Sequence, residues 1–368
     1  MINVVILKLT EICNLNCTYC YMFNSQDKTY KRVPRLMSEA VGMQVLSRIR
    51  EHLDSDPEAR LRIVLHGGEP TLWPREYFHA FLDEVKAIRT QTGRLTFGLQ
   101  TNLFEYDDKI VRKVAEAGGS IGVSLDGPEQ YNDAVRITHA GKGSYKQVTE
   151  NLKQLERDGF MPHFGGILTV ANPDIPPQVY FDWIKTLPKK RVSVLWPIHY
   201  NYDTPPQKDY GAWYAELFRL WVEEDDASIQ IRFFKDAIKR TLGHKNHGDS
   251  IGNDALNSLV INTDGQYERH DYLRYFSDGA IRTGFNVAGD SIDAASCDEV
   301  ISRYSDLRAH LPPECAECRH SDVCGGGFIA NRFGGSDKLS FERKSVMCED
   351  HKLFFDAVRQ YVDQWCVA

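Results

Sequence analysis

The sequence has no long hydrophobic run, and this limits where the protein can work. No apolar stretch approaches the roughly 20 residues that a membrane-spanning helix needs. The chain opens with MINVVILKLTEIC, which lacks the basic flank and the full apolar core of a secretory signal peptide. We therefore expect a soluble protein that stays in the cytoplasm and does not bind membranes.

Positive charge is not in surplus either. The 368 residues include 44 Lys and Arg against 51 Asp and Glu, which gives a formal net charge of -7. The basic residues are scattered, whereas a nucleic-acid-binding surface needs them gathered in a patch or stripe. Internal repeats and low-complexity tracts are also missing. A nucleic-acid partner is not expected, and the length is enough for one large domain with a smaller one.

Cysteine, in contrast, is present in a clustered arrangement. Seven of the nine cysteines fall into two groups, one at residues 13, 17 and 20 and the other at 315, 318, 324 and 348. In a reducing cytoplasm such clusters favour metal or iron–sulfur ligation over disulfides. The other two, Cys297 and Cys366, are expected to be ordinary packed or exposed thiols.

The first two hundred residues alternate between β-branched runs and amphipathic helical patterns. The runs expected to be strands are residues 3–8, 62–66, 95–100, 120–125, 164–170 and 191–196. Six such units with right-handed crossovers make a parallel sheet that curls towards a barrel. The fold class expected is therefore α/β, a partial (β/α)6 TIM-like barrel. Its active site should lie on the loops at the C-terminal ends of the strands.

The pattern changes in the C-terminal third of the chain. A Pro-marked loop and an aromatic-rich helix follow the last predicted barrel strand, and then come a short strand, cysteine-bearing loops and a closing helix. We expect a barrel domain at 1–235, a bridge at 236–255, a cysteine-bearing α+β domain at 256–350 and a C-terminal helix at 351–368.

The N-terminal cysteines have the spacing CxxxCxxC, with no fourth thiol or histidine in the next forty residues. A structural zinc site closes its coordination with four ligands, so three thiolates leave one metal position open. This motif, after a first strand, resembles that of the radical SAM superfamily. The resemblance implies a [4Fe–4S] cluster on Cys13, Cys17 and Cys20 whose open iron binds S-adenosylmethionine (SAM, or AdoMet). It also places an aromatic residue, here Tyr19, before the last cysteine.

Later motifs at the ends of predicted strands extend the resemblance. The sequence HGGEP follows the second strand, and the family pattern assigns its Gly67, Gly68 and Glu69 to the SAM amino group. LQTN and SLDGP end the third and fourth strands. The resemblance implies SAM contacts by the residues that match these motifs and a downstream arginine, namely Asn102, Ser124, Asp126 and Arg136. Arg136 would pair with the SAM carboxylate.

The C-terminal group, CAECRHSDVCGGGF followed by SVMC, supplies four thiolates. Four thiolates saturate either zinc or a four-iron cluster, so the local chemistry does not choose. Together with the N-terminal motif, the pattern resembles the SPASM extension, which implies an auxiliary [4Fe–4S] cluster on Cys315, Cys318, Cys324 and Cys348. The family carries a second auxiliary cluster, but Phe328 and His270 stand here where it has cysteines. We expect one auxiliary cluster, and His270 stays open as an iron ligand.

Asp271 follows the position of that missing thiol. In related SPASM enzymes an aspartate here faces the substrate, so the resemblance implies a general base that takes the proton released during radical oxidation. The plain alternative is an exposed loop carboxylate or a helix cap. His66 and Trp196 are expected to be packing residues.

The resemblance covers nearly the whole chain and is closest to SPASM maturases of ribosomally made peptides, in particular the branch that forms cyclophanes. It implies an oxidoreductase that joins an aromatic ring carbon to a β-carbon of another residue. The expected partners are a precursor peptide and an electron donor such as flavodoxin or ferredoxin. Because no leader-binding domain is recognised, either the bridge region or a separate leader-binding protein would bind the leader. The alternatives are formylglycine formation, epimerisation or thioether formation, a small-molecule radical SAM dehydrogenase or epimerase, and a zinc-stabilised binding protein.

Overall fold

The computed structural model describes residues 1–244, 257–304, 310–334 and 342–366. By its internal contacts the chain divides into two compact units. The first consists of Met1–Leu125, Asn132–Gly165 and Asn257–Ser302, and the second of Asp126–Tyr131, Gly166–Leu256 and Arg303–Ala368. None of the helices described is long and apolar enough to cross a bilayer.

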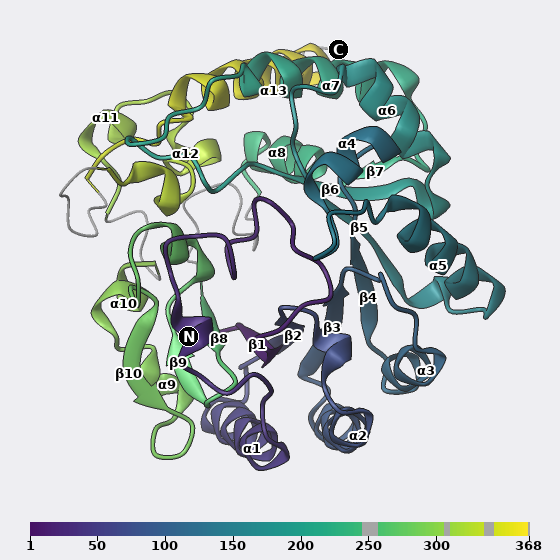
Figure 1. Ribbon diagram of the computed structural model, residues 1–368. Coiled ribbons are helices and arrows are strands. Elements are labelled where there is room, and N and C mark those ends of the chain that lie inside the picture. The colour runs from purple at the N-terminus through teal and green to yellow at the C-terminus, as the bar shows by residue number, and fades with distance from the viewer. Residues whose placement is uncertain (245–256, 305–309, 335–341, 367–368) are drawn as a thin grey trace. The chain divides into compact units, whose positions relative to one another are not determined.

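The first unit is built on a mainly parallel sheet. Its strands are β1 (Val4–Thr10), β2 (Leu61–Gly67), β3 (Leu95–Thr101), β4 (Ser120–Ser124), β8 (Ser258–Ile261), β9 (Gln266–Glu268) and β10 (Arg282–Asn286). They lie in the order β10-β9-β8-β1-β2-β3-β4. The strands from β8 to β4 run parallel, while β9 is antiparallel to both its neighbours. Figure 1 shows this arc, with β8, β9 and β10 continuing it beyond β1.

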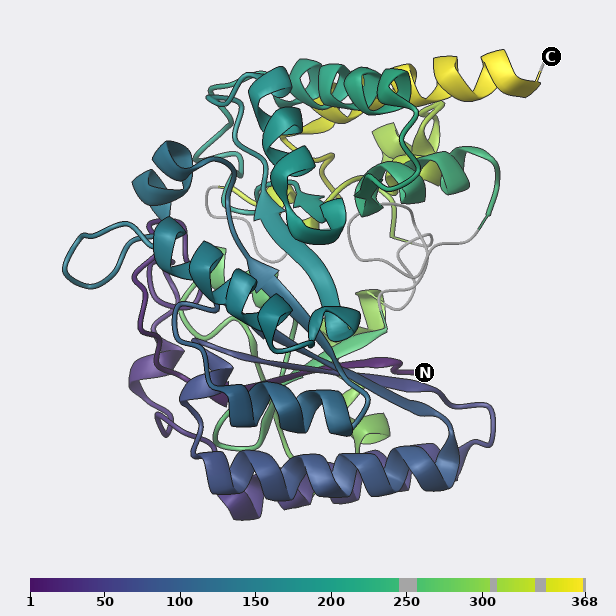
Figure 2. The ribbon, with the colours of Figure 1, turned by 90° about the vertical axis from the view of Figure 1, so that its right-hand side faces the viewer.

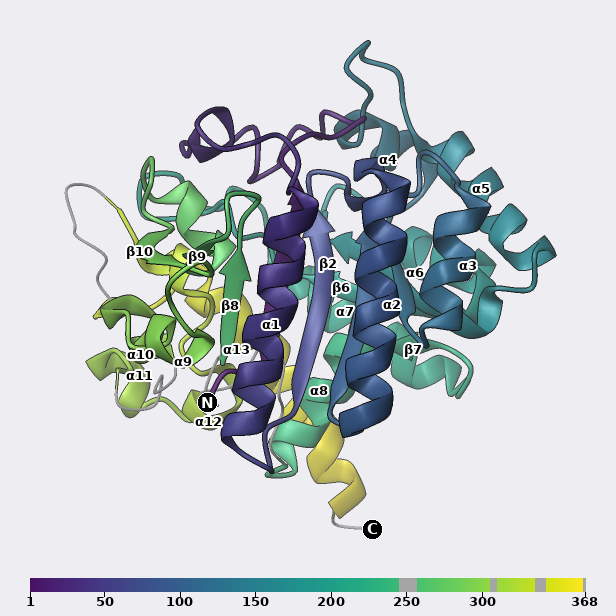
Figure 3. The same ribbon diagram turned by 90° about the horizontal axis from the view of Figure 1, so that it is seen from below.

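Helices cover the outer face of this sheet. They are α1 (Glu39–Ser55), α2 (Arg75–Thr92), α3 (Asp108–Glu116) and α5 (Tyr145–Arg157). Local signals set their ends: the Ser38 hydroxyl accepts a hydrogen bond from the Val41 N–H at the start of α1, and Gly93 ends α2 with a φ of +66°. Figure 3 shows α1, α2 and α3 side by side. Short elements complete the unit: α4 (Glu129–Val135), α9 (Ile292–Ala295), α10 (Glu299–Tyr304) and the 3-10 helix η5 (Asp271–Tyr275).

The second unit has a smaller parallel sheet and a helical layer. Its strands are β5 (Phe164–Val170), β6 (Arg191–Leu195) and β7 (Gln230–Ile231), paired in that order. The helices are α6 (Pro177–Thr186), α7 (Tyr210–Glu224), α8 (Arg232–Thr241), α11 (Pro313–Ala316), α12 (Ser321–Cys324) and α13 (Cys348–Cys366), with the 3-10 helix η6 (Ile329–Arg332). In Figure 2 the yellow α13 runs along the teal α7, and close backbone packing joins the two helices.

These elements confirm the predicted fold class, an α/β chain with a parallel sheet core of the partial TIM-barrel type. All six predicted strands are present, and the run at 164–170 matches β5 residue for residue. The pairing of β8 with β1 was not predicted. It brings a C-terminal segment beside the strand that leads to the first cysteines.

Candidate functional site

The three N-terminal cysteines lie on the loop that follows β1. These three cysteines form no disulfide and are partly exposed. Burial, together with the negative charges of Glu69, Cys17 and Cys20, raises the pKa of the Cys13 thiol to about 12. Because such like-charge effects act at short range, the thiols form one group. A bound cation would release their protons, so this donor set fits a metal cluster.

Two glycines allow the turn after β2 to approach that loop closely. A Cβ on Gly67 would lie 2.5 Å from the Thr10 carbonyl oxygen, and one on Gly68 would lie 2.1 Å from the Ile12 carbonyl oxygen. The Gly68 and Glu69 N–H groups donate to the same two carbonyl oxygens, each at 2.8 Å. The turn therefore fixes the backbone just before Cys13, for which only glycine leaves room.

Glu69 connects this turn to the end of β3. Its carboxylate is buried and accepts hydrogen bonds from the hydroxyls of Thr71 (2.8 Å) and Thr101 (2.7 Å) and from the N–H groups of Thr71 (3.2 Å) and Asn102 (2.8 Å). The Asn102 side-chain amide donates to the Cys13 sulfur at 3.4 Å and to the Asn14 side chain at 2.8 Å. Glu69 and Asn102 therefore lie at the cysteine loop. There the Glu69 carboxylate accepts hydrogen bonds from other groups of the protein.

The other predicted SAM-contacting residues fall into three places. Ser124 ends β4, and its hydroxyl accepts a hydrogen bond from the Gln100 amide at 3.0 Å. Asp126 belongs to the second unit, where its carboxylate accepts from the Val170 N–H at 2.9 Å.

Arg136 lies at the cysteine loop itself. It is nearly buried, and it donates to the Tyr19 hydroxyl at 2.9 Å. The Tyr19 carbonyl accepts from the Tyr275 hydroxyl at 2.7 Å. Burial raises the pKa of the Cys20 thiol, while the charge of Arg136 lowers it. The structure thus brings Tyr19, Arg136 and Cys20 together.

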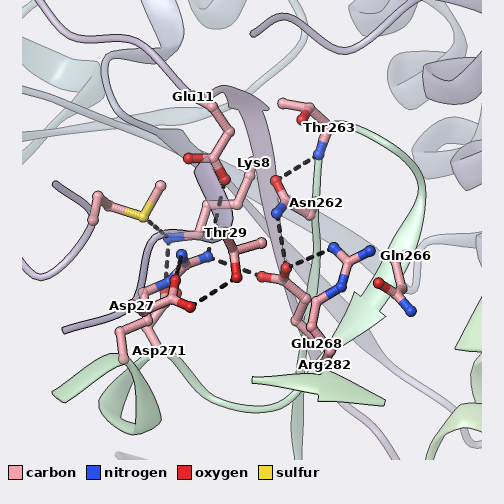
Figure 4. Close-up of polar contacts among 12 residues, drawn as sticks. Lys8, Glu11, Asp27, Thr29, Asn262, Thr263, Gln266, Glu268, Asp271 and Arg282 are labelled. Atoms are coloured by element: carbon pink, nitrogen blue, oxygen red, sulfur yellow. Dashed lines mark hydrogen bonds and ion pairs between the residues drawn. The ribbon is translucent and has the colours of Figure 1, made fainter. Parts of the chain in front are cut away.

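Asp271 is the first residue of η5 and belongs to a buried ionic network (Figure 4). It is 4% exposed, so the exposed-loop alternative is wrong. Its carboxylate binds the Lys8 ammonium at 2.6 Å and the Arg274 guanidinium at 3.0 Å. Burial alone would raise the pKa of Asp271, but these two cations outweigh burial and hold that pKa below its usual range.

The network extends from Arg274 to two more carboxylates. Arg274 donates to Asp27 at 2.7 Å and to Glu268 at 2.9 Å, and the side chains of all three are fully buried. Burial raises the pKa of Glu268 to about 7, against the opposing charge of Arg274. Buried carboxylates outnumber buried cations here, which favours protonation of Glu268 at acidic pH.

Sequence reasoning missed Lys8 and gave His66 only a packing role. The Lys8 ammonium also contacts the Met22 sulfur at 3.3 Å and the Tyr21 hydroxyl at 3.4 Å. The His66 ring stacks against Tyr21 with ring centroids 6.5 Å apart, and burial lowers the pKa of His66 to about 3. A lysine inside the apolar run VVILKLT was the available signal, because an unpaired charge is not tolerated there.

The four C-terminal cysteines form a second site, in the second unit. Their thiols line one cavity of about 180 Å³. Among the residues that the structure describes, no three side chains converge on a point that holds a single metal ion. Zinc draws its sulfur ligands to about 3.8 Å from one another, as follows from Zn–S bonds near 2.3 Å. Thiols spread around a cavity fit a polynuclear cluster.

Two further side chains adjoin this cavity. His351, which lies three residues after Cys348 on α13, has its Nδ1 3.6 Å from the Cys324 sulfur. Burial lowers the pKa of His351 to about 3, so its ring is neutral. Arg332 is also buried. Burial raises the pKa of Cys324 to about 12, and the positive charge of Arg332 opposes that rise. The spacing CEDH was a signal for His351, whereas nothing in the sequence singles out Arg332.

The structure shows the surroundings of three of the four residues that lie outside the predicted ligand sets. His270 caps η5, where its Nδ1 accepts the Tyr272 N–H at 3.5 Å, and Phe328 is buried. Cys297 is exposed and bonds the Asp293 carbonyl at 3.5 Å, as expected for an ordinary thiol. The side chain of Cys366 lies outside the described residues.

Comparison with known proteins finds similar proteins along nearly the whole chain. Residues 7–178 match the radical SAM superfamily. A cysteine-type anaerobic sulfatase-maturating enzyme of Clostridium novyi (strain NT) is 24% identical over 96% of this chain and 94% of its own. A serine-type enzyme of Bacteroides thetaiotaomicron is 22% identical over 98% and 90%. The structure of native anSMEcpe with bound AdoMet has a TM-score of 0.82 at 20% identity and covers 98% of both chains.

These matches, the cysteine loop and the glycine turn that holds the loop all support the same interpretation of the chain. They overturn the alternative of a zinc-stabilised binding protein. The radical SAM superfamily, which residues 7–178 match, uses SAM and a [4Fe–4S] cluster, and the structure of anSMEcpe contains bound AdoMet. Residues 7–178 thus match the radical SAM superfamily, and nearly the whole chain is similar to the anaerobic sulfatase-maturating enzymes.

Proposed function

We propose that this enzyme removes two hydrogen atoms, that is two electrons and two protons, from a ribosomally made peptide and joins an aromatic ring carbon to a β-carbon, forming a cyclophane. The observation that carries the two-electron oxidation is the pairing of an incomplete three-thiol site with a complete four-thiol site. The first suits an exchangeable ligand and the second suits electron storage. The cyclophane itself rests on the motif resemblance of the C-terminal segment.

In this proposal the loop after β1 starts the reaction. Cys13, Cys17 and Cys20 hold the [4Fe–4S] cluster, which when bound supplies the electron that cleaves SAM to a 5′-deoxyadenosyl radical. The backbone at Gly67 and Gly68 shapes the site around SAM, while Glu69 fixes the loops by its internal hydrogen bonds. The remaining contacts to SAM are assigned to Tyr19, Asn102, Ser124, Asp126 and Arg136.

Asp271 is the proposed general base. The β-carbon would lose one hydrogen atom to the deoxyadenosyl radical, and the resulting carbon radical would add to the aromatic ring. The ring adduct would then lose one electron, with the four-thiol centre as the acceptor, and one proton to Asp271, which would restore aromaticity. A carboxylate held ionised by Lys8 and Arg274 is a weak base, but a cationic ring adduct is acidic enough for it.

A second candidate is oxidation of one cysteine or serine side chain to formylglycine. The names of the relatives favour it, since they are cysteine-type and serine-type sulfatase-maturating enzymes. It uses the same hydrogen abstraction and the same loss of an electron and a proton. Only the fate of the carbon radical differs.

The proposed partners follow from this chemistry. A solved structure of anSMEcpe contains AdoMet and the Cp18Cys peptide, which supports a peptide substrate for this chain as well. A flavodoxin or ferredoxin would supply the electron for each SAM cleavage, and a separate protein would bind the peptide leader. We place the reaction in the cytoplasm, where clustered thiols stay reduced.

The test is anaerobic incubation of the iron-loaded enzyme with SAM, dithionite and peptides encoded beside its gene. We expect 5′-deoxyadenosine and a peptide that has lost two hydrogens, with fragmentation blocked between two linked residues. An aldehyde on a single cysteine or serine would establish the second candidate. Peptides that remain unchanged while SAM is cleaved would contradict both.

A further inference from the structure

Two buried side chains next to the four-thiol site, a cation and a hydrogen-bond donor, can both stabilise negative charge on its sulfur atoms. Arg332 ends η6 and is 1% exposed, and His351 on α13 is 4% exposed. Both lie beside Cys324, the thiol that precedes three consecutive glycines. Neither residue belongs to a cysteine motif.

The glycine turn holds Arg332 in place. Gly325, Gly326 and Gly327 all have positive φ angles, between +64° and +80°. Their carbonyl oxygens accept from the guanidinium: Gly326 from Nε at 3.1 Å, and Gly325 and Gly327 from Nη2 at 2.9 and 3.1 Å. A Cβ on Gly326 would lie 2.3 Å from the guanidinium. The turn therefore fixes a positive charge next to the thiol that it follows.

His351 is fixed from the other side. Its ring meets the face of Trp196 edge-on, with centroids 4.5 Å apart at 87°. A Cβ on Gly327 would lie 2.6 Å from the His351 ring, so this glycine also leaves space for a functional side chain. With the proton on Nδ1, the neutral ring donates to the Cys324 sulfur across the 3.6 Å contact.

We propose that Arg332 and His351 are positioning residues that set the electron affinity of the four-thiol centre. The inference rests on the proposed function, in which that centre accepts one electron from the substrate while Asp271 takes the proton. Each electron adds one negative charge at the sulfur ligands. A fixed cation and an N–H donor stabilise that charge, and the potential of an iron–sulfur cluster follows its net charge and the hydrogen bonds to its sulfurs.

The test measures the reduction potential of this centre directly, without peptide. The full-length chain carries Cys13→Ala, Cys17→Ala and Cys20→Ala, so that the only iron–sulfur signal followed comes from the four-thiol centre. Arg332→Met, His351→Phe and His351→Gln are compared in this background by redox titration with electron paramagnetic resonance (EPR). The control is Arg219→Met, which removes an exposed arginine of α7 that pairs with Glu216 and Glu223.

We expect Arg332→Met to make reduction at least tenfold less favourable, a decrease of about 59 mV for a one-electron couple. His351→Phe should lower the potential by less, and His351→Gln, which keeps an N–H donor, should restore part of it. The control should match the parent. Potentials equal to the control in Arg332→Met and His351→Phe, with iron retained, would overturn the proposal. If Arg332→Met does not hold iron, the proposal is overturned when both His351 variants have the same reduction potential as the control.

These outcomes separate the inference from the proposed function. Zinc in place of iron at the four-thiol site would overturn both, and metal analysis detects it before any titration. Shifted potentials in the variants, together with a wild-type enzyme that oxidises no peptide, would support the inference as a property of the centre and overturn the proposed function alone.

Discussion

The two cysteine sites differ in how the chain supplies their ligands and in what surrounds them. The first takes three thiols from one loop between residues 13 and 20, held by a glycine turn and next to the buried Glu69. The second takes four thiols from separate segments around one cavity, next to Arg332 and His351. Three thiols on one loop leave a metal position open for an exchangeable ligand such as SAM. Four thiols near a fixed cation suit a centre that gains and loses an electron.

The largest effect should come from the first site. Cys17→Ala removes one of its three ligands and should abolish formation of 5′-deoxyadenosine from SAM, because the cluster no longer assembles there. The product is measured by chromatography under dithionite. Cys297→Ala is the matched control, since this exposed thiol lies outside both sites. Equal loss of product in the two variants would contradict the assignment.

Loss of the second site should separate SAM cleavage from peptide oxidation. Cys348→Ala is expected to leave 5′-deoxyadenosine formation within a few-fold of wild type. It should lower formation of oxidised peptide by about 100-fold or more, the loss of about 3 kcal/mol of transition-state stabilisation. Both products are quantified in one reaction. A variant that couples cleavage to oxidation as well as wild type does would show that the second site does not take the electron.

Much of this comparison was predictable from the sequence, because its signals are local. The strand and helix periods placed all six barrel strands, and the spacing of the cysteines predicted two groups of thiols. The pairing of β8 with β1 and the position of Arg332 were not predictable. Lys8 and His351 each had a local signal, but their contacts were not predictable. They depend on contacts between residues far apart in the chain, which leave no periodic pattern.

The proposed role of Asp271 as a general base can be tested by removing its charge. Asp271→Asn leaves Lys8 and Arg274 with less opposing charge in a buried setting, which should lower the free energy of unfolding by about 3 kcal/mol. Peptide oxidation should fall by about 100-fold while SAM cleavage continues. The control is Asp278→Asn, which breaks an exposed ion pair with Arg32 and should change stability little. SAM cleavage and peptide oxidation falling together in Asp271→Asn would argue against a base.

The glycine turn can be tested by one added methyl group. Gly68→Ala places a Cβ 2.1 Å from the Ile12 carbonyl oxygen, so the backbone before Cys13 must move. We expect a loss of stability of about 2 kcal/mol, of the size seen for overpacking, and a tenfold or larger drop in SAM cleavage. Gly289→Ala meets no neighbour within 4 Å and serves as the control. Wild-type SAM cleavage by Gly68→Ala would show that the close approach does not shape the site.

The last expected effect changes stability alone and is a dependence of the free energy of unfolding on pH. Burial raises the pKa of Glu268 from 4.5 to about 7, so the folded protein binds its proton more tightly than the unfolded chain does. This contribution is complete below pH 4.5 and is lost as the pH rises through about 7, a decrease of up to about 3 kcal/mol. Glu268→Gln should flatten that part of the profile in denaturant titrations. An unchanged profile would place the titration elsewhere.

The most direct test of the division between the two sites is the response of each reduced centre to SAM. EPR spectra are recorded with and without SAM for two variants. One lacks the second site, with Cys315, Cys318, Cys324 and Cys348 replaced by alanine, and the other lacks the first, with Cys13, Cys17 and Cys20 replaced by alanine. The account predicts that SAM changes the signal of the first variant and leaves that of the second unchanged. A SAM-dependent change at the four-thiol centre, or none at the three-thiol centre, would contradict it.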